Sequence, residues 1–143
     1  MKRNMFGALM AFIVACTIVV PAVHAQSSIV TKADVPFAFT VGSNQMPAGA
    51  IEVRELGYRA TLIQTKDRSA HVLGIYPYAG PNKKGDNKLV FHKVGDRYFL
   101  AEIWTTSEDA GLLVPKSAME KEMTASNYAN TGGGPETVIV AMR

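Results

Sequence analysis

The stretch LVFHKVGDRYFLAEIWT, residues 89–105, constrains the fold more than any other part of the chain. Apolar and polar residues alternate on both sides of Gly95 and Asp96, a pattern typical of two strands around a two-residue turn. Glycine at the first turn position suits a type II′ turn, whose twist matches that of the paired strands. The stretch therefore predicts an antiparallel β-hairpin at the centre of the fold.

Five other segments show the same alternation, and turn-forming residues separate them. Strands do not alternate with long helices along the chain, which argues against a parallel α/β sheet. We therefore predict a mainly β fold, an antiparallel β-sandwich or partly open barrel of about seven strands with one short helix near the C-terminus. The five further strands are expected at residues 35–41, 50–55, 60–65, 70–78 and 137–142.

A helix signal appears in the segment SAMEKEM. Ser117 followed three residues later by Glu120 forms a capping box, in which each side chain satisfies a backbone N–H of the other residue. Met119 and Met123 lie four residues apart and share a helix face, so we expect the methionines to pack the helix. The expected order is a short helix at 115–125, a glycine-rich connector at 126–136 and a terminal strand at 137–142.

The first residues of the chain have the layout of an export signal. Lys2 and Arg3 precede an uninterrupted apolar run at residues 5–20, and the small-residue pattern VHA follows at 23–25. A transmembrane anchor would instead need about 20 apolar residues and no cleavage pattern. We therefore expect export to the periplasm or the exterior, with no membrane span after cleavage. The predicted divisions are a signal peptide at 1–25 and a single β domain at 26–143.

Cys16 offers a second interpretation of the same segment. The sequence IVAC resembles the lipobox of bacterial lipoproteins, in which the cysteine receives the lipid. Lipoproteins usually continue with a polar tether, whereas TIVVPAVHA stays apolar and ends in the cleavage pattern. We therefore favour a cleaved signal peptide over a lipoprotein.

Cleavage after Ala25 changes the composition of the chain. It removes Cys16, the only cysteine, so we expect a disulfide-free domain despite export. It also removes Lys2 and Arg3, so the net charge falls from +3 to +1. Such a balanced charge provides no field to attract nucleic acid, and we expect no nucleic-acid partner.

His92 and Glu102 have the chemistry of an acid–base pair. Pairing the hairpin about its turn sets His92 opposite Phe99 and Glu102 opposite Leu89. Because side chains alternate between faces, His92 and Glu102 are expected on opposite sides of the sheet. We therefore assign no catalytic residue, and we expect His92→Ala to lower stability rather than to abolish turnover.

Other chemical signatures are missing from the sequence. Beyond the predicted signal peptide the only histidines are His71 and His92, without a cysteine or a second histidine at ligand spacing, so we predict no metal site. The chain has no G-x-S-x-G nucleophile elbow, and its TGGGPE run lacks the lysine of a phosphate loop. The sequence therefore implies no cofactor.

Three aromatic residues are candidates for ligand contact: Tyr76, Tyr78 and Trp104. Tyr76 and Tyr78 fall on one face of a strand end, where exposed rings could stack on a sugar or on a partner's proline. If buried, they are ordinary core or rim residues, which is the interpretation that we favour. Trp104 is open to two interpretations, a ligand contact or a large apolar anchor of the hairpin.

Three consecutive glycines at 132–134 precede the terminal strand. Such a hinge lets that strand pair within its own sheet or add to the exposed edge of a neighbour, which would give a homo-oligomer. We favour pairing within the chain, because the apolar residues of the tail need a partner at any concentration. If the strand serves a neighbour, deletion of 137–143 should abolish oligomers and leave a folded monomer.

Three segments, DVPFAFTVGSNQMPAG, KLVFHKVGDRYFLAEIWT and LVPKSAMEKEM, together resemble a group of small exported proteins common in Acidobacteria. Members typically read VPFxFxVG…LPAGxYxV…LVFHRYGDRYFLxxxW…LPKSxAE, and the likeness covers most of the mature chain. Ile51 stands where the group carries an aromatic residue. The resemblance implies export and a compact β domain, and it supplies no catalytic residue.

These observations predict an exported β-domain protein with a non-catalytic, structural or self-associating role in the bacterial envelope. A glycan- or polymer-binding module is the alternative, and a hydrolytic enzyme is the weaker alternative. Oligomers, retention on a polysaccharide, and a turnover that depends on His92 are the observations that distinguish the three.

Overall fold

The computed structural model describes residues 30–57, 60–67, 70–74, 76–81, 87–106 and 110–143. The predicted signal peptide at 1–25 and Cys16 lie outside these residues, so export stays a prediction. Within the described part of the chain, no helix is long and apolar enough to cross a membrane.

The described residues form eleven strands and one helix, which confirms the predicted mainly β fold with a helix near the C-terminus. The strand number exceeds the prediction because short strands flank the expected ones. The elements are β1 Val30–Val35, β2 Phe39–Val41, β3 Asn44–Met46, β4 Gly49–Gly57, β5 Ala60–Thr65, β6 Ala70–Gly74, β7 Tyr76–Pro81, β8 Lys88–Val94, β9 Arg97–Trp104, β10 Ala110–Leu113, α2 Ala118–Thr131 and β11 Glu136–Ala141.

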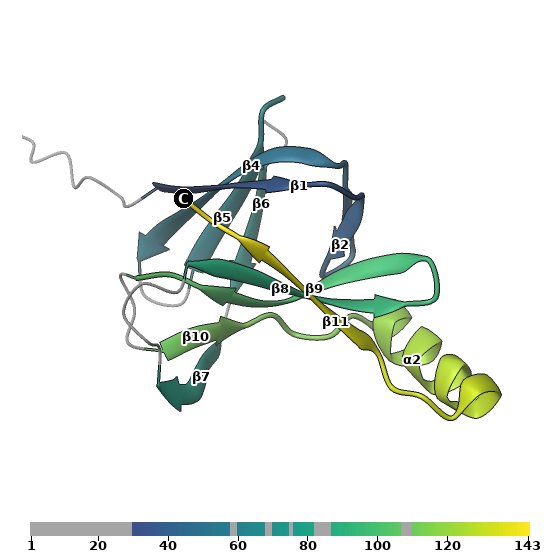
Figure 1. Ribbon diagram of the computed structural model, residues 1–143. Helices are drawn as coiled ribbons and strands as arrows, with labels where there is room; N and C mark the ends of the chain where they lie inside the picture. The colour runs from purple at the N-terminus through teal and green to yellow at the C-terminus, as the bar shows by residue number, and fades with distance from the viewer. Residues whose placement is uncertain (1–29, 58–59, 68–69, 75, 82–86, 107–109) are drawn as a thin grey trace, which may run out of the picture.

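The strands form two sheets, as a sandwich requires (Figure 1). The smaller sheet has the order β1-β4-β5-β6, and every described pairing within it is antiparallel. The larger sheet has the order β11-β8-β9-β10-β7 and also includes β2 and β3. Strand β2 pairs in parallel with β9, which attaches the short β2–β3 hairpin to the larger sheet.

The chain terminus joins the two sheets along one side. Lys32 of β1 and Arg143 exchange both backbone hydrogen bonds at 2.8 Å, and Ala33 forms an isolated bridge with Met142. The last residues of the chain therefore connect the smaller sheet to β11. This connection leaves two sheets rather than a continuous barrel among the described strands.

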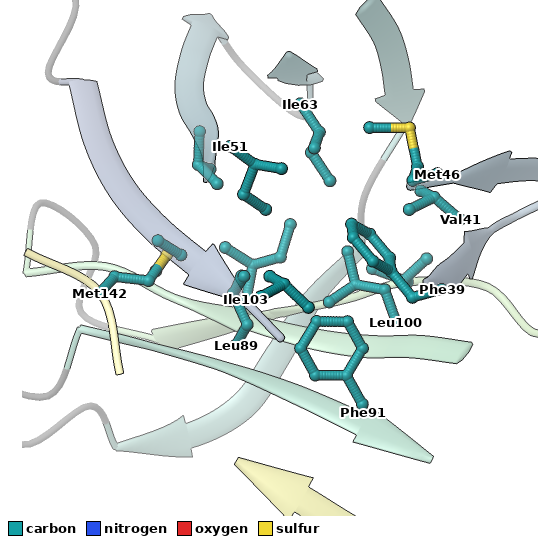
Figure 2. Close-up of a cluster of buried hydrophobic side chains, with 14 residues drawn as sticks. Phe39, Val41, Met46, Ile51, Ile63, Leu89, Phe91, Leu100, Ile103 and Met142 are labelled. Atoms are coloured by element: carbon teal, nitrogen blue, oxygen red, sulfur yellow. The ribbon is translucent and has the colours of Figure 1, made fainter. Parts of the chain in front are cut away.

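The core lies between the two sheets, and strand alternation explains which residues enter it (Figure 2). Every second residue of β1, β4, β5 and β8 points inward, as the alternating burial of β1 and β5 shows. Burying each large aliphatic or aromatic side chain contributes about 1.5–3 kcal/mol. The largest buried side chains of this core are Phe39, Phe91, Met46, Ile51, Ile63, Leu89, Leu100 and Ile103.

The β8–β9 hairpin confirms the predicted turn. Gly95 has a φ of +59°, the left-handed value that the first position of a primed hairpin turn requires. The predicted register holds from the pair Val94–Arg97 to the pair Phe91–Leu100. Local twist and hydrogen bonding thus fix the half of the hairpin next to the turn.

A β-bulge makes the predicted register wrong in the other half of the hairpin. The register shifts after Phe91, so that Val90 lies opposite Glu102 instead of Ala101. An extra residue in one strand reverses the face of every residue beyond it. Ile103 consequently enters the core, and Glu102 turns to the outer face of the sheet, where His92 also lies.

Helix α2 is longer than predicted. It spans Ala118–Thr131 rather than 115–125, so half of the predicted connector is helical. Gly132 ends the helix with a φ of +71°, and its N–H donates to the carbonyl of Tyr128. A helix persists until a residue that tolerates the left-handed conformation, and Gly132 is the first glycine in this segment.

The expected packing of α2 by its methionines is wrong for Met119. Met119 is 46% exposed, and its sulfur accepts a hydrogen bond from Arg97 at 3.1 Å. Glu120 is instead the buried residue of the helix, at 3% exposure, and Met123 is half-buried. The contact of the helix with the sheet therefore includes a buried polar residue.

Candidate functional site

Strand β11 lies at one edge of the larger sheet, where only β8 flanks it in the strand order (Figure 1). It pairs antiparallel with β8 over six residues, from Glu136–Lys93 to Ala141–Lys88. The terminal strand thus pairs within its own chain in this structure, and it begins one residue earlier than predicted. Among the described strands, none pairs with its other side, which is a sheet edge.

The hydrogen-bond pattern decides which backbone groups of β11 face the open edge. Consecutive residues of an antiparallel strand direct their N–H and C=O groups alternately toward the partner and away from it. The N–H of Met142 donates to the carbonyl of Asn87, in line with the β11–β8 ladder. Counting back along β11 from Met142, every second residue therefore directs its backbone N–H and C=O groups toward β8. Thr137 and Ile139, which lie between them, direct their backbone groups outward.

The open part of this edge has definite ends. At the C-terminal end, β1 covers it through the Ala33–Met142 bridge. At the N-terminal end, β11 begins at Glu136, whose side chain forms an ion pair with Lys93 of β8 at 3.3 Å. We call the open segment, residues 136–140, the β11 edge.

The contact with Glu136 favours the charged form of Lys93. The hydrogen bond to Glu136, and then its negative charge, raises the pKa of Lys93 above the usual value of 10.5. A raised lysine pKa means that the contribution of the pair is complete below the usual pKa and is lost as the pH rises through the folded value. Lys93 therefore keeps its positive charge at neutral pH.

Side chains on β11 alternate between the core and the outer face of the sheet. Val138 and Val140 are half-buried and pack against the core. Thr137 and Ile139 point to the outer face, where Ile139 is 61% exposed. A branched apolar residue at this exposure, on a strand with unpaired backbone groups, is the combination that proteins usually avoid at a sheet edge.

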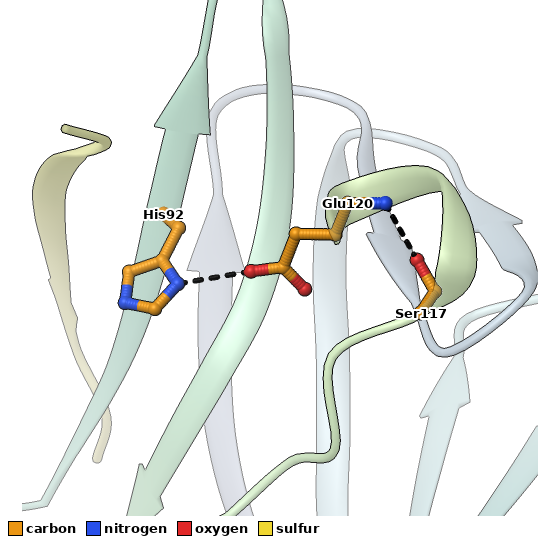
Figure 3. Close-up of polar contacts among 3 residues, drawn as sticks. All are labelled: His92, Ser117 and Glu120. Atoms are coloured by element: carbon orange, nitrogen blue, oxygen red, sulfur yellow. Dashed lines mark hydrogen bonds and ion pairs between the residues drawn. The ribbon is translucent and has the colours of Figure 1, made fainter. Parts of the chain in front are cut away.

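Next to this edge, on β8, His92 forms a part-buried polar contact with Glu120 of α2 (Figure 3). Nδ1 of His92 lies 3.0 Å from Oε1 of Glu120, and the side chains are 22% and 4% exposed. Strand β8 positions the imidazole, and the first turn of α2 positions the carboxylate. A buried carboxylate that fixes one ring nitrogen of a histidine is the arrangement found in general bases.

The predicted capping box is half formed. The Oγ of Ser117 accepts a hydrogen bond from the N–H of Glu120 at 3.1 Å, as predicted (Figure 3). The carboxylate of Glu120 bonds His92 instead of returning to Ser117. The acid partner of His92 is thus Glu120, not Glu102, and the sequence did not reveal it because 28 positions separate the two residues.

The His92–Glu120 contact also differs from a complete catalytic group. In the part of the chain that the structure describes, no side chain hydrogen-bonds the second ring nitrogen of His92. A nucleophilic mechanism needs a hydroxyl or thiol within hydrogen-bond reach of that nitrogen. The contact as it stands fastens α2 to β8.

Glu102 joins Trp104 instead of His92. The indole N–H of Trp104 donates to Oε2 of Glu102 at 2.8 Å, on the outer face of β9. Trp104 is half-buried and lies outside the core cluster between the sheets. The β-bulge that turned Glu102 outward also turned Trp104 outward.

The other predicted candidates are only partly described. Tyr76 and Tyr78 lie on β7, where Tyr76 pairs with Leu113 of β10, and their side chains lie outside the described set. The same holds for the side chain of His71 on β6. Among the described residues no group of three potential metal ligands is present.

A shallow depression of about 420 Å³ lies on the smaller sheet. Its polar wall includes Lys32 and Glu52, which form an ion pair at 3.2 Å with side chains 69% and 40% exposed. Exposed ion pairs are screened by solvent and hold their side chains weakly. This depression is therefore less preorganised than the features of the larger sheet.

The sequence matches no protein-family model, and no curated protein or solved structure matches the chain.

Proposed function

We propose that this protein is a non-catalytic structural component of the bacterial envelope, which self-associates by pairing the β11 edge of one copy with that of another. The observation that carries the proposal is the outward direction of the backbone groups of Thr137 and Ile139 on an edge strand. Strand addition satisfies such groups and extends the sheet. Export, predicted from the leader, would deliver the domain to the envelope.

Antiparallel pairing of two β11 edges is geometrically self-consistent. In a two-fold arrangement with Val138 opposite Val138, Thr137 of each copy faces Ile139 of the other. These are the residues whose N–H and C=O groups point outward, so each such pair forms two hydrogen bonds. Paired residues share a face, so the exposed Ile139 side chain packs on Thr137 of the second copy. The same patch thus serves both copies, as a two-fold interface requires.

Proline substitutions at neighbouring positions test the β11 edge. Ile139→Pro removes an N–H that points to the open edge and leaves the bonds to β8, so we expect a folded monomer. Ile139→Lys, which places like charges across the two-fold axis, should also give a monomer. The mature wild-type chain should give a dimer that dissociates on dilution. Size-exclusion chromatography with light scattering measures the mass of each.

Val140→Pro is the matched control for this experiment. Its N–H bonds β8, so the substitution should lower the midpoint of urea unfolding much more than Ile139→Pro does. A wild-type chain that stays monomeric at millimolar concentration contradicts the proposal. Dimers that persist in both Ile139 variants place the interface on another surface and also contradict it.

A further inference from the structure

Met119 is an exposed methionine whose sulfur contacts a cation. It lies on the first turn of α2 and is 46% exposed, and Arg97 is the exposed first residue of β9. Nη1 of Arg97 donates a hydrogen bond to Sδ of Met119 at 3.1 Å. In the part of the chain that the structure describes, the Arg97 side chain has no other hydrogen bond and no ion pair. Because a thioether sulfur is a weak acceptor, this guanidinium keeps most of its capacity to donate.

The other methionines beyond the predicted signal peptide are less accessible than Met119. Met46 is 1% exposed, Met142 is 6% exposed, and both belong to the core between the sheets. Met123 is half-buried. Oxidation of a thioether requires direct contact between the oxidant and the sulfur. Among these four residues, Met119 is therefore the one that an oxidant in solution reaches most readily.

We infer that Met119 is a site of oxidative modification by hydroperoxides, and that Arg97 holds the methionine sulfoxide that forms. A lone pair of the sulfur attacks one peroxide oxygen, so that the S–O bond forms as the O–O bond breaks. The sulfur loses two electrons, and the peroxide is reduced. The proton of the transferred oxygen passes to the leaving oxygen, which departs as water when the oxidant is hydrogen peroxide.

The position of Arg97 determines what this modification does to the fold. The new oxygen is bonded to the sulfur that already lies 3.1 Å from Nη1, so it forms within reach of the guanidinium. A hydrogen bond from a charged donor is roughly twice as strong as one between neutral groups. Methionine oxidation usually disrupts a structure because it makes an apolar core residue polar. Met119 lies outside the core, so its oxidation should instead strengthen the contact between α2 and β9.

This modification is independent of the proposed self-association. Arg97 lies on β9, and β8 separates β9 from the β11 edge in the strand order. A monomeric chain would leave the chemistry of Met119 unchanged, and a chain whose Met119 resists oxidation would leave the proposed dimer unchanged.

Mass spectrometry of peptides identifies the methionine that reacts. The folded mature chain is treated with hydrogen peroxide, and the rate of oxidation is measured for each methionine. We expect Met119 to react about tenfold faster than Met46 and Met142, and faster than Met123, in line with their exposure. The four rates should become similar in a chain unfolded by urea. A folded chain in which Met123 reacts as fast as Met119 would overturn the assignment of the site.

Thermal unfolding before and after this oxidation tests the role of Arg97. Oxidation should raise the midpoint of the wild type by about 2–4 °C, and it should leave the midpoint of Arg97→Ala unchanged or lower it. Arg97 is exposed, so Arg97→Ala is expected to fold. Comparing each protein with its own unoxidised form removes any effect of Arg97 that does not involve Met119.

Met119→Leu is the matched control for the peroxide treatment. It cannot form a sulfoxide at this position, so the same treatment should not raise its midpoint. Arg97→Lys keeps a charged donor and should keep part of the increase seen in the wild type. The inference is overturned if oxidation changes the midpoints of the wild type and of Arg97→Ala by the same amount.

Discussion

At the scale of single residues, the His92–Glu120 contact joins α2 to the larger sheet. Glu120 is almost completely buried, and its one described side-chain partner is His92 at 3.0 Å. A buried carboxylate without a hydrogen-bond partner is costly, so the contact fixes where the first turn of α2 must lie. The two residues are therefore expected to act as a unit.

A double-mutant cycle measures the energetic coupling between His92 and Glu120. Glu120→Ala and His92→Ala should each lower the free energy of unfolding by about 1–3 kcal/mol, since each removes a partly buried hydrogen bond to an ionisable group. The double variant should lower the free energy of unfolding by less than the sum of the two single decreases, with a coupling energy of about 1 kcal/mol. Urea unfolding of the four proteins provides the values. Strictly additive costs would show that the two side chains do not interact in solution.

At the scale of elements, α2 has a capping contact at each end. Its side toward the sheet carries the buried, polar Glu120 beside a half-buried methionine, where helices usually carry apolar residues alone. The Ser117 side chain satisfies one N–H at the first turn, and Gly132 satisfies a carbonyl at the last. Most helices in proteins draw their stability from an apolar face, which makes the caps unusually important here.

Removal of the N-cap should therefore destabilise α2 measurably. Ser117→Ala removes the acceptor of the Glu120 N–H and should lower the free energy of unfolding by about 1 kcal/mol. Ser126→Ala, the same change at an exposed position within α2, is the matched control and should be neutral or slightly stabilising. Thermal unfolding followed by circular dichroism compares the two. Equal effects of the two substitutions would mean that Ser117 does not act as a cap.

At the scale of the whole molecule, the last two residues connect the sheets. Met142 is 6% exposed and belongs to the core, while Arg143 exchanges backbone hydrogen bonds with Lys32 of the smaller sheet. Strand β11 also contributes Val138 and Val140 to the packing of the core. The C-terminal strand is thus part of the folded domain, whatever it does at its open edge.

Substitution of Met142 tests this role. Met142→Ala leaves a cavity between the sheets and should lower the free energy of unfolding by about 2–4 kcal/mol. Ile139→Ala, on the exposed face of the same strand, should change it by less than about 0.5 kcal/mol. Urea unfolding measures the free energy of both variants.

Because β11 is part of the folded domain, deletion of 137–143 should leave an unfolded chain rather than the folded monomer expected from sequence. A truncated protein that unfolds cooperatively in urea would refute this expectation.

The fold class and the hairpin turn could be predicted from sequence because they rest on local patterns. Gly95 supplies the left-handed backbone that the turn needs, and alternation of apolar residues assigns each strand an inner face. No local sequence pattern predicts the β-bulge after Phe91, because the packing of both sheets together determines where an extra residue is accommodated. Compared with the predicted register, this shift of one residue places Ile103 in the core and places Glu102 and Trp104 on the outer face.

The sequence by itself determined that this chain forms a two-layer β domain with a central hairpin and a capped helix, since side-chain periodicity and turn chemistry act over a few neighbouring residues. Only the tertiary structure decided the partners of the functional candidates. It brought Glu120 to His92 and Glu102 to Trp104, and it placed β11 at a sheet edge. Such contacts join residues through sheet register and strand order, which depend on the packing of the whole domain.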